Sequence, residues 1–371
     1  MTKKTRLIIV LFCVACFLII APILVLHSIG YRFDLEKMKI TATGGIYVRT
    51  FPAPERVVID SKILEKPGMF SNSVFTQNLL PDLHTVLIEK NGYYDYVKTL
   101  PVKGKEVTKL ENVLLFKKNI KFDVVKDTTQ SPFNTEEKFI IKNNNLYYSN
   151  APENSAVPAS IKSSPVLKKI VAFTIQNNNI IWLSTDGLLH KSDLLNLAST
   201  DPVKITLAPI KMSKIGSYKI ITDNKDIFVD NNGNLLLLNT KTNNLDIFAS
   251  PVKNAKISPD SKNIAYFDQK NLYITILGEP VNKNILYKSP ETITDFIWLN
   301  NYYLIIASAN KIAISEIDNR GNVNIIDLPQ TITIADDKID IKNPQIFFNQ
   351  QEGKLYILID KTLLSSEKLI P

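Results

Sequence analysis

The sequence is poor in the residues that form redox, metal and nucleophilic sites. Of its 371 residues, only 2 are cysteine and 3 are histidine. Cys13 and Cys16 both lie inside an apolar N-terminal run, so the rest of the chain cannot form a disulfide or a thiolate metal site. A C-x-x-C pair is typical of redox and metal proteins, but in hydrocarbon surroundings we interpret these cysteines as small lipid-facing side chains.

Catalytic motifs are absent as well. Beyond residue 117 the one histidine is His190, and nucleophilic catalysis most often needs a histidine base. No G-x-S-x-G, H-E-x-x-H, P-loop or dinucleotide fingerprint occurs. The acidic cluster Asp336, Asp337 and Asp340 leaves a glycoside hydrolase as an alternative, although a solvated loop explains it equally. We predict no enzyme activity, no metal and no cofactor.

The positive charge is too scattered to indicate a nucleic-acid partner. The formal net charge is +8, and Lys3, Lys4 and Arg6 contribute three of these charges at the N-terminus. Elsewhere no lysine or arginine block is longer than a pair, and no DNA- or RNA-binding motif occurs. We therefore expect a mild attraction to anionic surfaces and no nucleic acid.

An uncharged run from Leu7 to Leu26 predicts a membrane span. As a helix, about 20 residues reach roughly 30 Å, the hydrocarbon thickness of a bilayer. Because the basic cluster precedes the run, the positive-inside rule places the N-terminus in the cytoplasm and the bulk of the chain outside the cell membrane. A cleaved signal peptide is the alternative, but the run is long for one and no small-x-small cleavage site follows it.

The stretch from Asn254 to Lys288 is one copy of a repeating unit. It contains four short apolar runs separated by turn residues, and the runs are rich in β-branched and aromatic residues. A four-stranded antiparallel unit with apolar residues on both faces must pack between neighbours, which is typical of β-propeller blades.

Six pairs of second and third strands recur at intervals near 40 residues, the period of propeller blades. They are Phe139–Lys142 with Leu146–Tyr148, Ile180–Leu183 with Leu188–Lys191, Ile227–Val229 with Leu235–Leu238, Ile264–Phe267 with Leu272–Ile276, Tyr303–Ala307 with Ile312–Glu316, and Gln345–Phe348 with Leu355–Ile359. We predict a six-bladed propeller over residues 117–371, in which residues 117–137 are a linker or supply a ring-closing strand.

A smaller domain precedes the propeller. Residues 1–30 hold the tail and the span, residues 31–44 form a connector, and residues 45–116 contain about six short strands typical of an antiparallel sandwich. The predicted fold class is therefore all-β, with one N-terminal transmembrane helix.

Residues 45–116 resemble the PEGA domain at four points in register. These are Gly45-Ile46-Tyr47-Val48, the proline-rich turn before Val57-Val58-Ile59-Asp60, the turn Leu79-Leu80-Pro81-Asp82-Leu83-His84, and Gly92-Tyr93. The signature tetrad is replaced by Pro52-Ala53-Pro54-Glu55, and Asp82 stands where the family has glycine. The resemblance implies an extracytoplasmic, non-catalytic module of prokaryotic envelopes, in which we expect His84 to pack or to cap a backbone group.

The element Ser258-Pro259-Asp260-Ser261-Lys262, followed by Ile264-Ala265-Tyr266, resembles TolB-like and WD-repeat propellers, which usually carry glycine at the position of Ser261. Ligands of propellers usually sit on the face formed by the loops between second and third strands. The candidate ligand-binding residues in these loops are Thr185, Asp186, Asp230, Asn232, Asp268, Lys270, Asn310 and Lys311, with Gln350 and Glu352 in the last blade. We expect this rim to bind envelope polysaccharide or protein.

Two segments share a D-N-x-G-N pattern, residues 230–234 and 318–322. Alternating oxygen ligands suit calcium, but both segments lack the glutamate of an EF-hand loop, and side-chain-stabilised hairpins explain both. The sequence thus favours a membrane-anchored, extracytoplasmic binding or scaffold protein, and the alternatives are a propeller hydrolase and the ectodomain of a sensory complex.

Overall fold

A computed structural model describes residues 3–35, 37–63, 72–126, 132, 139–148, 165–197, 201–213, 216–223, 225–279, 284–334 and 337–370. Apart from the N-terminal helix the chain consists mainly of short strands, so the predicted all-β fold is confirmed. Two compact units are present. Unit 1 holds Met1–Ile120, Asp318–Asn324 and Leu369–Pro371, and unit 2 holds Lys121–Ile317 and Ile325–Lys368. The sequence had placed residues 318–324 in the propeller, whereas their contacts place them in unit 1.

The predicted span lies within helix α1 (Lys3–Ser28). Among the described residues, α1 is the one helix long and apolar enough to cross a membrane. None of its apolar window is buried by the protein, as expected for a surface that faces lipid. The helix ends where the N–H of Ile29 bonds to the carbonyl of Val25 and the N–H of Gly30 to that of His27.

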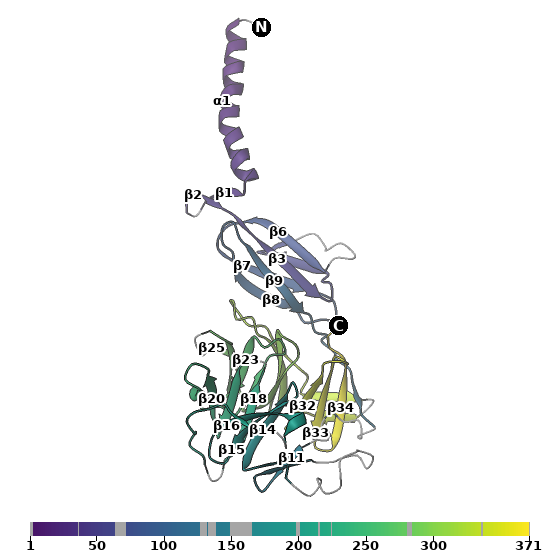
Figure 1. Ribbon diagram of the computed structural model, residues 1–371. Helices are drawn as coiled ribbons and strands as arrows, with labels where there is room; N and C mark the ends of the chain where they lie inside the picture. The colour runs from purple at the N-terminus through teal and green to yellow at the C-terminus, as the bar shows by residue number, and fades with distance from the viewer. Residues whose placement is uncertain are drawn as a thin grey trace. The chain divides into compact units, whose positions relative to one another are not determined.

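After the helix, β1 (Tyr31–Asp34) and β2 (Lys39–Ala42) form an antiparallel hairpin. Unit 1 then builds two sheets (Figure 1). One has the order β6-β3-β9 and contains β3 (Gly44–Phe51), β6 (Ser73–Leu79) and β9 (Val107–Leu114). The other has the order β5-β4-β7-β8 and contains β4 (Arg56–Ile59), β5 (Lys62–Ile63), β7 (Leu83–Glu89) and β8 (Tyr96–Pro101).

The two sheets share one core, so the segment is a sandwich as predicted. Inward-facing residues of both sheets, such as Ile46 and Val48 of β3 with Val86 and Ile88 of β7, form a single buried cluster. The expectation of a purely antiparallel sandwich is wrong, because β3 pairs with β9 in parallel. Parallel strands need a long connection, and here that connection contains β6 and all four strands of the second sheet.

The described part of unit 2 contains six sheets of three or four strands, which we number as blades 1 to 6, and one separate two-stranded hairpin. Many of the blade strands are labelled in Figure 1. Blade 1 comprises β11 (Phe139–Lys142), β12 (Asn145–Tyr148) and β13 (Leu167–Lys168), and blade 2 comprises β14 (Ile170–Gln176), β15 (Asn179–Ser184), β16 (Leu189–Asp193) and β17 (Val203–Lys204), with the 3-10 helix η2 (Leu194–Asn196) before β17. Blade 3 comprises β18 (Tyr218–Thr222), β19 (Ile227–Asn231), β20 (Asn234–Asn239) and β21 (Asn244–Ala249).

The remaining blades repeat the same meander. Blade 4 comprises β22 (Asn254–Ile257), β23 (Asn263–Phe267), β24 (Asn271–Ile276) and β25 (Asn284–Lys288), and blade 5 comprises β26 (Ile293–Trp298), β27 (Tyr303–Ser308), β28 (Lys311–Glu316) and β29 (Ile325–Asp327). Blade 6 has the order β10-β34-β33-β32, with β10 (Phe122–Val124), β32 (Gln345–Asn349), β33 (Lys354–Ile359) and β34 (Thr362–Lys368). A separate hairpin, β30 (Thr331–Ile334) with β31 (Asp337–Asp340), lies between blades 5 and 6 in the sequence.

All six predicted strand pairs form. The first strands of successive blades lie close to one another, β14 to β18, β18 to β22, β22 to β26 and β26 to β32, so they form the inner edge of the repeat. Facing blades bury apolar residues between them. For example, Phe228 and Leu235 of blade 3 share a cluster with Ile264 and Tyr266 of blade 4.

Blade 6 differs from the sequence assignment. The pair β32 and β33 holds its first and second strands, not its second and third, because β32 contacts the first strand of blade 5. The third strand is β34, and the fourth is β10, which comes from the chain before blade 1 and pairs Phe122 with Ser366. A strand near residue 120 is therefore used by the last blade.

Candidate functional site

The eight predicted ligand-binding residues lie at one end of blades 2 to 5. They occupy the turns from second to third strand or the strand residues next to those turns, and in an antiparallel meander these turns share one end of the sheets. Gln350 and Glu352 do not belong with them. Their turn joins the first and second strands of blade 6 and therefore lies at the opposite end.

A backbone hydrogen bond fixes each turn at this end to the next blade. In blades 1 to 5 a turn carbonyl accepts from an N–H in the first strand of the following blade or in the segment that leads to it. The bonds run from Ile170 to Asn144 (2.8 Å), Ile210 to Gly187 (2.9 Å), Val252 to Gly233 (2.8 Å), Ile293 to Gln269 (2.8 Å) and Asn343 to Ala309 (2.6 Å). These turns thus join blade to blade as well as strand to strand.

The predicted carboxylates are largely engaged inside their own turns. Asp268 accepts from the N–H groups of Lys270 and Asn271, both at 2.8 Å, and from the Tyr273 hydroxyl at 2.9 Å. Burial alone would raise the pKa of Asp268, but these hydrogen bonds hold it below its usual value. Asp186 accepts from the hydroxyl of Ser184, which lowers its pKa.

The other predicted groups are also partly used. The Lys311 amine lies 2.7 Å from a carboxylate oxygen of Asp327, and the Lys270 amine donates to the carbonyl of Pro290 at 3.1 Å. Asn310 donates its N–H to Glu291 at 3.1 Å. Most of the rim chemistry that the sequence singled out therefore stabilises turns, as Asn and Asp commonly do.

A polar group that the sequence did not single out joins the first strands of blades 3, 4 and 5. Lys219 of β18 donates to Asn254 of β22 at 3.2 Å, and Asn254 donates to Asp295 of β26 at 3.1 Å. The amine of Lys256, also on β22, lies 2.9 Å from the same Asp295 oxygen. We call Lys219, Asn254, Lys256 and Asp295 the inner-strand cluster.

The inner-strand cluster is held in place by its surroundings. The Lys256 amine also donates to the backbone carbonyl of Phe296. It lies 5.3 Å from the centre of the Phe296 aromatic ring. The indole N–H of Trp298 donates to the carbonyl of Lys256 at 3.1 Å. Side chains and backbone groups of neighbouring blades thus fix one another within the cluster.

Two pKa shifts mark this part of the repeat. The pKa of Lys219 is lowered, first because the surrounding protein removes part of its hydration and then because Lys256 repels its charge. The pKa of Asp230, on β19, is raised because burial disfavours the carboxylate, although the N–H of Gly233 and the charge of Lys219 oppose this. Perturbed groups of this kind are more frequent at functional sites than elsewhere.

A hollow of about 410 Å³ adjoins the cluster at the end of the blades that carries the predicted turns. It is lined by Lys253, Asn254, Phe267, Gln269, Thr292, Ile293, Thr294 and Asp295. Asn254 and Asp295 thus belong both to the hollow and to the cluster. Amide, hydroxyl, amine and carboxylate groups line this hollow together, as they do in sites that bind polar ligands.

The sequence separation of the cluster residues is a pattern from which the cluster could have been predicted. Its bonded partners are 35, 39 and 41 residues apart, close to one blade repeat. Aligning the blades on their first strands would have shown polar residues at matching positions in blades 3, 4 and 5. The turn motifs instead predict ligand-binding residues in the turns of the same blades.

Among the described residues, no group of three His, Cys, Asp or Glu side chains could hold a metal ion. Of the predicted acidic cluster, Asp336 lies outside the described residues and Asp337 belongs to β31. Asp340 is exposed and accepts from the hydroxyl of Thr331 at 2.9 Å. His190 stacks on Trp182 with ring centres 5.4 Å apart, and burial lowers its pKa, which favours the neutral ring.

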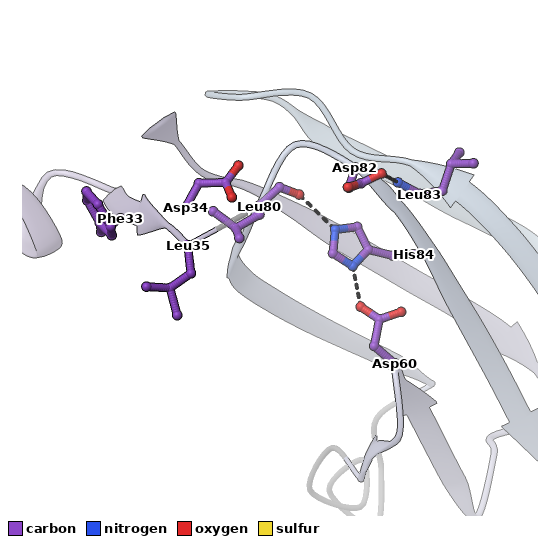
Figure 2. A pocket seen from close by; sticks show the side chains of 8 residues that line it. All are labelled: Phe33, Asp34, Leu35, Asp60, Leu80, Asp82, Leu83 and His84. Carbon is purple, nitrogen blue, oxygen red and sulfur yellow. Dashed lines mark hydrogen bonds and ion pairs between the residues drawn. The ribbon is translucent and has the colours of Figure 1, made fainter. Parts of the chain in front are cut away.

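Unit 1 has a separate hollow of about 320 Å³, lined by Phe33, Asp34, Leu35, Asp60, Leu80, Asp82, Leu83 and His84 (Figure 2). Both ring nitrogens of His84 are engaged, one with the carboxylate of Asp60 and the other with the carbonyl of Leu80 at 2.8 Å. The expectation that His84 has a structural role, with a bond to a backbone group, is confirmed.

No family model and no curated protein matches this chain. Solved structures that are similar include the extracellular domain of a hybrid two-component system from B. thetaiotaomicron, with TM-score 0.39 and 10% identity over 76% of this chain and 36% of that chain. Another is the Cps50 (Swd1) β-propeller domain of Myceliophteria thermophila, with TM-score 0.37 and 13% identity over 52% of this chain and 63% of that one.

The chain thus spans about a third of the first of these structures and less than two thirds of the second. Both TM-scores are below 0.5. The assignment of the fold therefore rests on the strand pairing of this chain alone. Without a family match, the likeness of residues 45–116 to PEGA domains remains a resemblance of short motifs.

Proposed function

We propose that the chain is a membrane-anchored, extracytoplasmic binding or scaffold protein of a prokaryotic cell envelope. In this proposal the inner-strand cluster and its hollow bind envelope polysaccharide or a polar protein surface. The observation that carries the binding role is the hydrogen-bonded row of Lys219, Asn254 and Asp295 across three blades beside an open hollow. Such a row presents donors and acceptors in a fixed order, which suits a ligand rich in hydroxyl or amide groups.

The anchoring role is supported by α1, whose length and composition suit a bilayer. The basic residues Lys3, Lys4 and Arg6 at its start favour a cytoplasmic N-terminus. Protease added to spheroplasts should therefore digest both units and leave a short membrane-bound fragment. Full protection of the propeller would contradict this orientation.

Binding should be tested with the full chain in lipid nanodiscs, using immobilised envelope polysaccharide as the probe. We expect Lys219→Met and Asp295→Asn each to weaken retention about tenfold, because each removes a charged hydrogen-bonding group. The matched control is Lys262→Met. Lys262 has a 75% exposed side chain and lies in the turn at the opposite end of blade 4.

Unchanged retention in both cluster variants, with the control also unchanged, would move the binding surface away from the inner-strand cluster. Loss in all three variants would indicate a general charge effect. We also propose that the protein binds without catalysis. In that case, replacing Asp336, Asp337 and Asp340 together with asparagine should leave retention unchanged, and neither form should hydrolyse the polysaccharide.

A further inference from the structure

The hairpin of β1 and β2 carries four large apolar side chains that the described protein leaves uncovered. Phe33 is 51% exposed, Leu35 77%, Met38 73% and Ile40 55%. Single exposed apolar residues are common on proteins, but four within eight residues form a patch. We call these four side chains the hairpin patch.

The strand register gathers the hairpin patch on one side of the hairpin. Phe33 pairs directly with Ile40, and directly paired residues project to the same face. Leu35 and Met38 continue the strands at the tip. Figure 2 shows Asp34 projecting to one side of β1, beside Leu80, while Leu35 projects to the other.

The opposite side of the hairpin is fixed to unit 1. Asp34 is only 4% exposed and lines the hollow that also contains Leu80 and His84. At the base of the hairpin, the N–H and hydroxyl of Thr43 both donate to the carbonyl of Gly30, at 2.7 and 2.8 Å. Phe33 and Leu35 of the hairpin patch border the same hollow, and all four patch side chains remain more than half exposed.

The patch also lies very close to the membrane span along the chain. Only Ile29 and Gly30 separate the end of α1 from the start of β1. Three residue steps reach roughly 10 Å at most. The headgroup layer on each side of a bilayer is roughly 5–8 Å thick, so the first strand of the hairpin begins within reach of it.

From these observations we propose that the hairpin patch inserts into the headgroup layer of the bilayer that α1 crosses. The insertion gives the chain a second membrane contact beside the span. The apolar side chains enter the boundary between headgroups and acyl chains. This inference depends on the membrane anchoring proposed above, and the experiment separates the two.

The test uses the full chain in liposomes, with Cys13 and Cys16 replaced by serine and one environment-sensitive label on a new cysteine. Labels at Leu35→Cys in the patch, Ile19→Cys in α1 and Ile247→Cys on β21 are compared. Ile247 is the matched control because it is 73% exposed and lies in a blade. Quenching is measured with aqueous iodide and with lipids brominated close to the headgroup.

We expect the label at position 35 to be quenched by the brominated lipid and to be several-fold less accessible to iodide than the label at position 247. Combining Phe33→Ser and Ile40→Ser should restore iodide access at position 35, because the partner side chains that hold the tip in the lipid are removed.

Three results would overturn the proposal. One is a label at position 35 with the same iodide and lipid quenching as the label at position 247, while the label at position 19 is protected from iodide. In that case α1 anchors the chain but the hairpin patch does not insert. Another is protection from iodide without quenching by lipid, which would mean that protein covers the patch. An iodide-accessible label at position 19 would refute the anchoring itself.

Discussion

The two D-N-x-G-N segments begin with the same residue types and have different structures. In residues 230–234, the Asp230 carboxylate accepts from the N–H of Gly233 at 3.1 Å, inside the tight turn between β19 and β20. In residues 318–322, the Asn322 side chain accepts from the N–H of Thr99 at 2.9 Å and donates to the carbonyl of Val97 at 2.7 Å. The first segment stabilises the turn of its own hairpin. The second satisfies backbone groups of strand β8 in unit 1.

Strand β8 explains the difference. It lies at the edge of its sheet, so one side of its backbone has no strand partner. Residues 318–324 occupy that side. Asn324 accepts from the N–H of Val97 at 3.3 Å, and the fully buried amine of Lys98 donates to the carbonyl of Asp318 at 2.5 Å. The same pattern of residues thus forms a hairpin turn in one place and covers a sheet edge in the other.

The largest expected difference concerns the glycines of the two segments. A Cβ at Gly321 would lie 2.0 Å from the carbonyl oxygen of Thr99, and the residue has φ +66, whereas a Cβ at Gly233 would meet only the Val252 oxygen at 3.5 Å with φ +89. We expect Gly321→Ala to destabilise unit 1 by about 3 kcal/mol and Gly233→Ala to destabilise its blade by about 1 kcal/mol.

Hydrogen exchange of the full chain should report this difference. In Gly321→Ala the amides of Val97 and Thr99 should lose protection, because the segment can no longer approach β8. Equal effects of the two substitutions would mean that the contact with β8 contributes little.

An intermediate difference is expected at the asparagines. Asn322→Ala removes two bonds to a sheet edge and should cost about 2 kcal/mol. Asn234→Ala removes a 3.3 Å bond to the carbonyl of Asn231 and a 2.7 Å bond from the Ser250 hydroxyl. The first of these is long and local, so the substitution should cost about 1 kcal/mol. Denaturant unfolding of each variant measures both values, and the reverse order would contradict the comparison.

The smallest expected difference is between the two aspartates. Their contributions to the stability of the fold should change in opposite directions as the pH falls. Burial alone would raise the pKa of Asp318, but hydrogen bonds from Arg320 and the charge of Lys98 hold it below its ordinary value of 3.8. Asp318 therefore stabilises the fold above that value, and its contribution is lost as the pH falls. Burial raises the pKa of Asp230, so its contribution is present in acid and is lost as the pH rises through its folded pKa.

Unfolding midpoints at pH 7 and near pH 3 should separate the two cases. Asp318→Asn should lower stability at pH 7 and have a smaller effect near pH 3. Asp230→Asn should lower stability less at pH 7 than near pH 3. Parallel pH profiles for the two variants would show that the segments have equivalent electrostatic environments.

The same contrast explains what the sequence could predict. The strands of blade 4 were predictable because runs such as Ile264–Phe267 are β-branched or aromatic and are bounded by turn residues. The covering of β8 was not, because it joins residues more than 200 positions apart. The parallel pairing of β3 with β9 and the bonding within the inner-strand cluster also join separate segments, at shorter separations along the chain. Each depends on contacts between segments whose own patterns do not indicate a partner.

The rim residues show what turn chemistry alone can account for. Asn and Asp in the blade turns were predicted correctly as turn residues, and the same chemistry that makes them good turn residues occupies their oxygens. Asp268 is the clearest example, since its carboxylate already accepts four hydrogen bonds within its own turn.

The pairing of β10 with β34 sets an order of events during synthesis. Strand β10 emerges more than 230 residues before its partner, so it has no strand beside it while blades 1 to 5 are made. Closing so long a loop is slow, and an unpaired strand in the meantime is prone to wrong pairing. A chain that stops before Thr362 can contain every other blade and still lack the partner of its first strand. Completing blade 6 thus couples the earliest strand of unit 2 to one of its latest, and it cannot occur before β34 has been made.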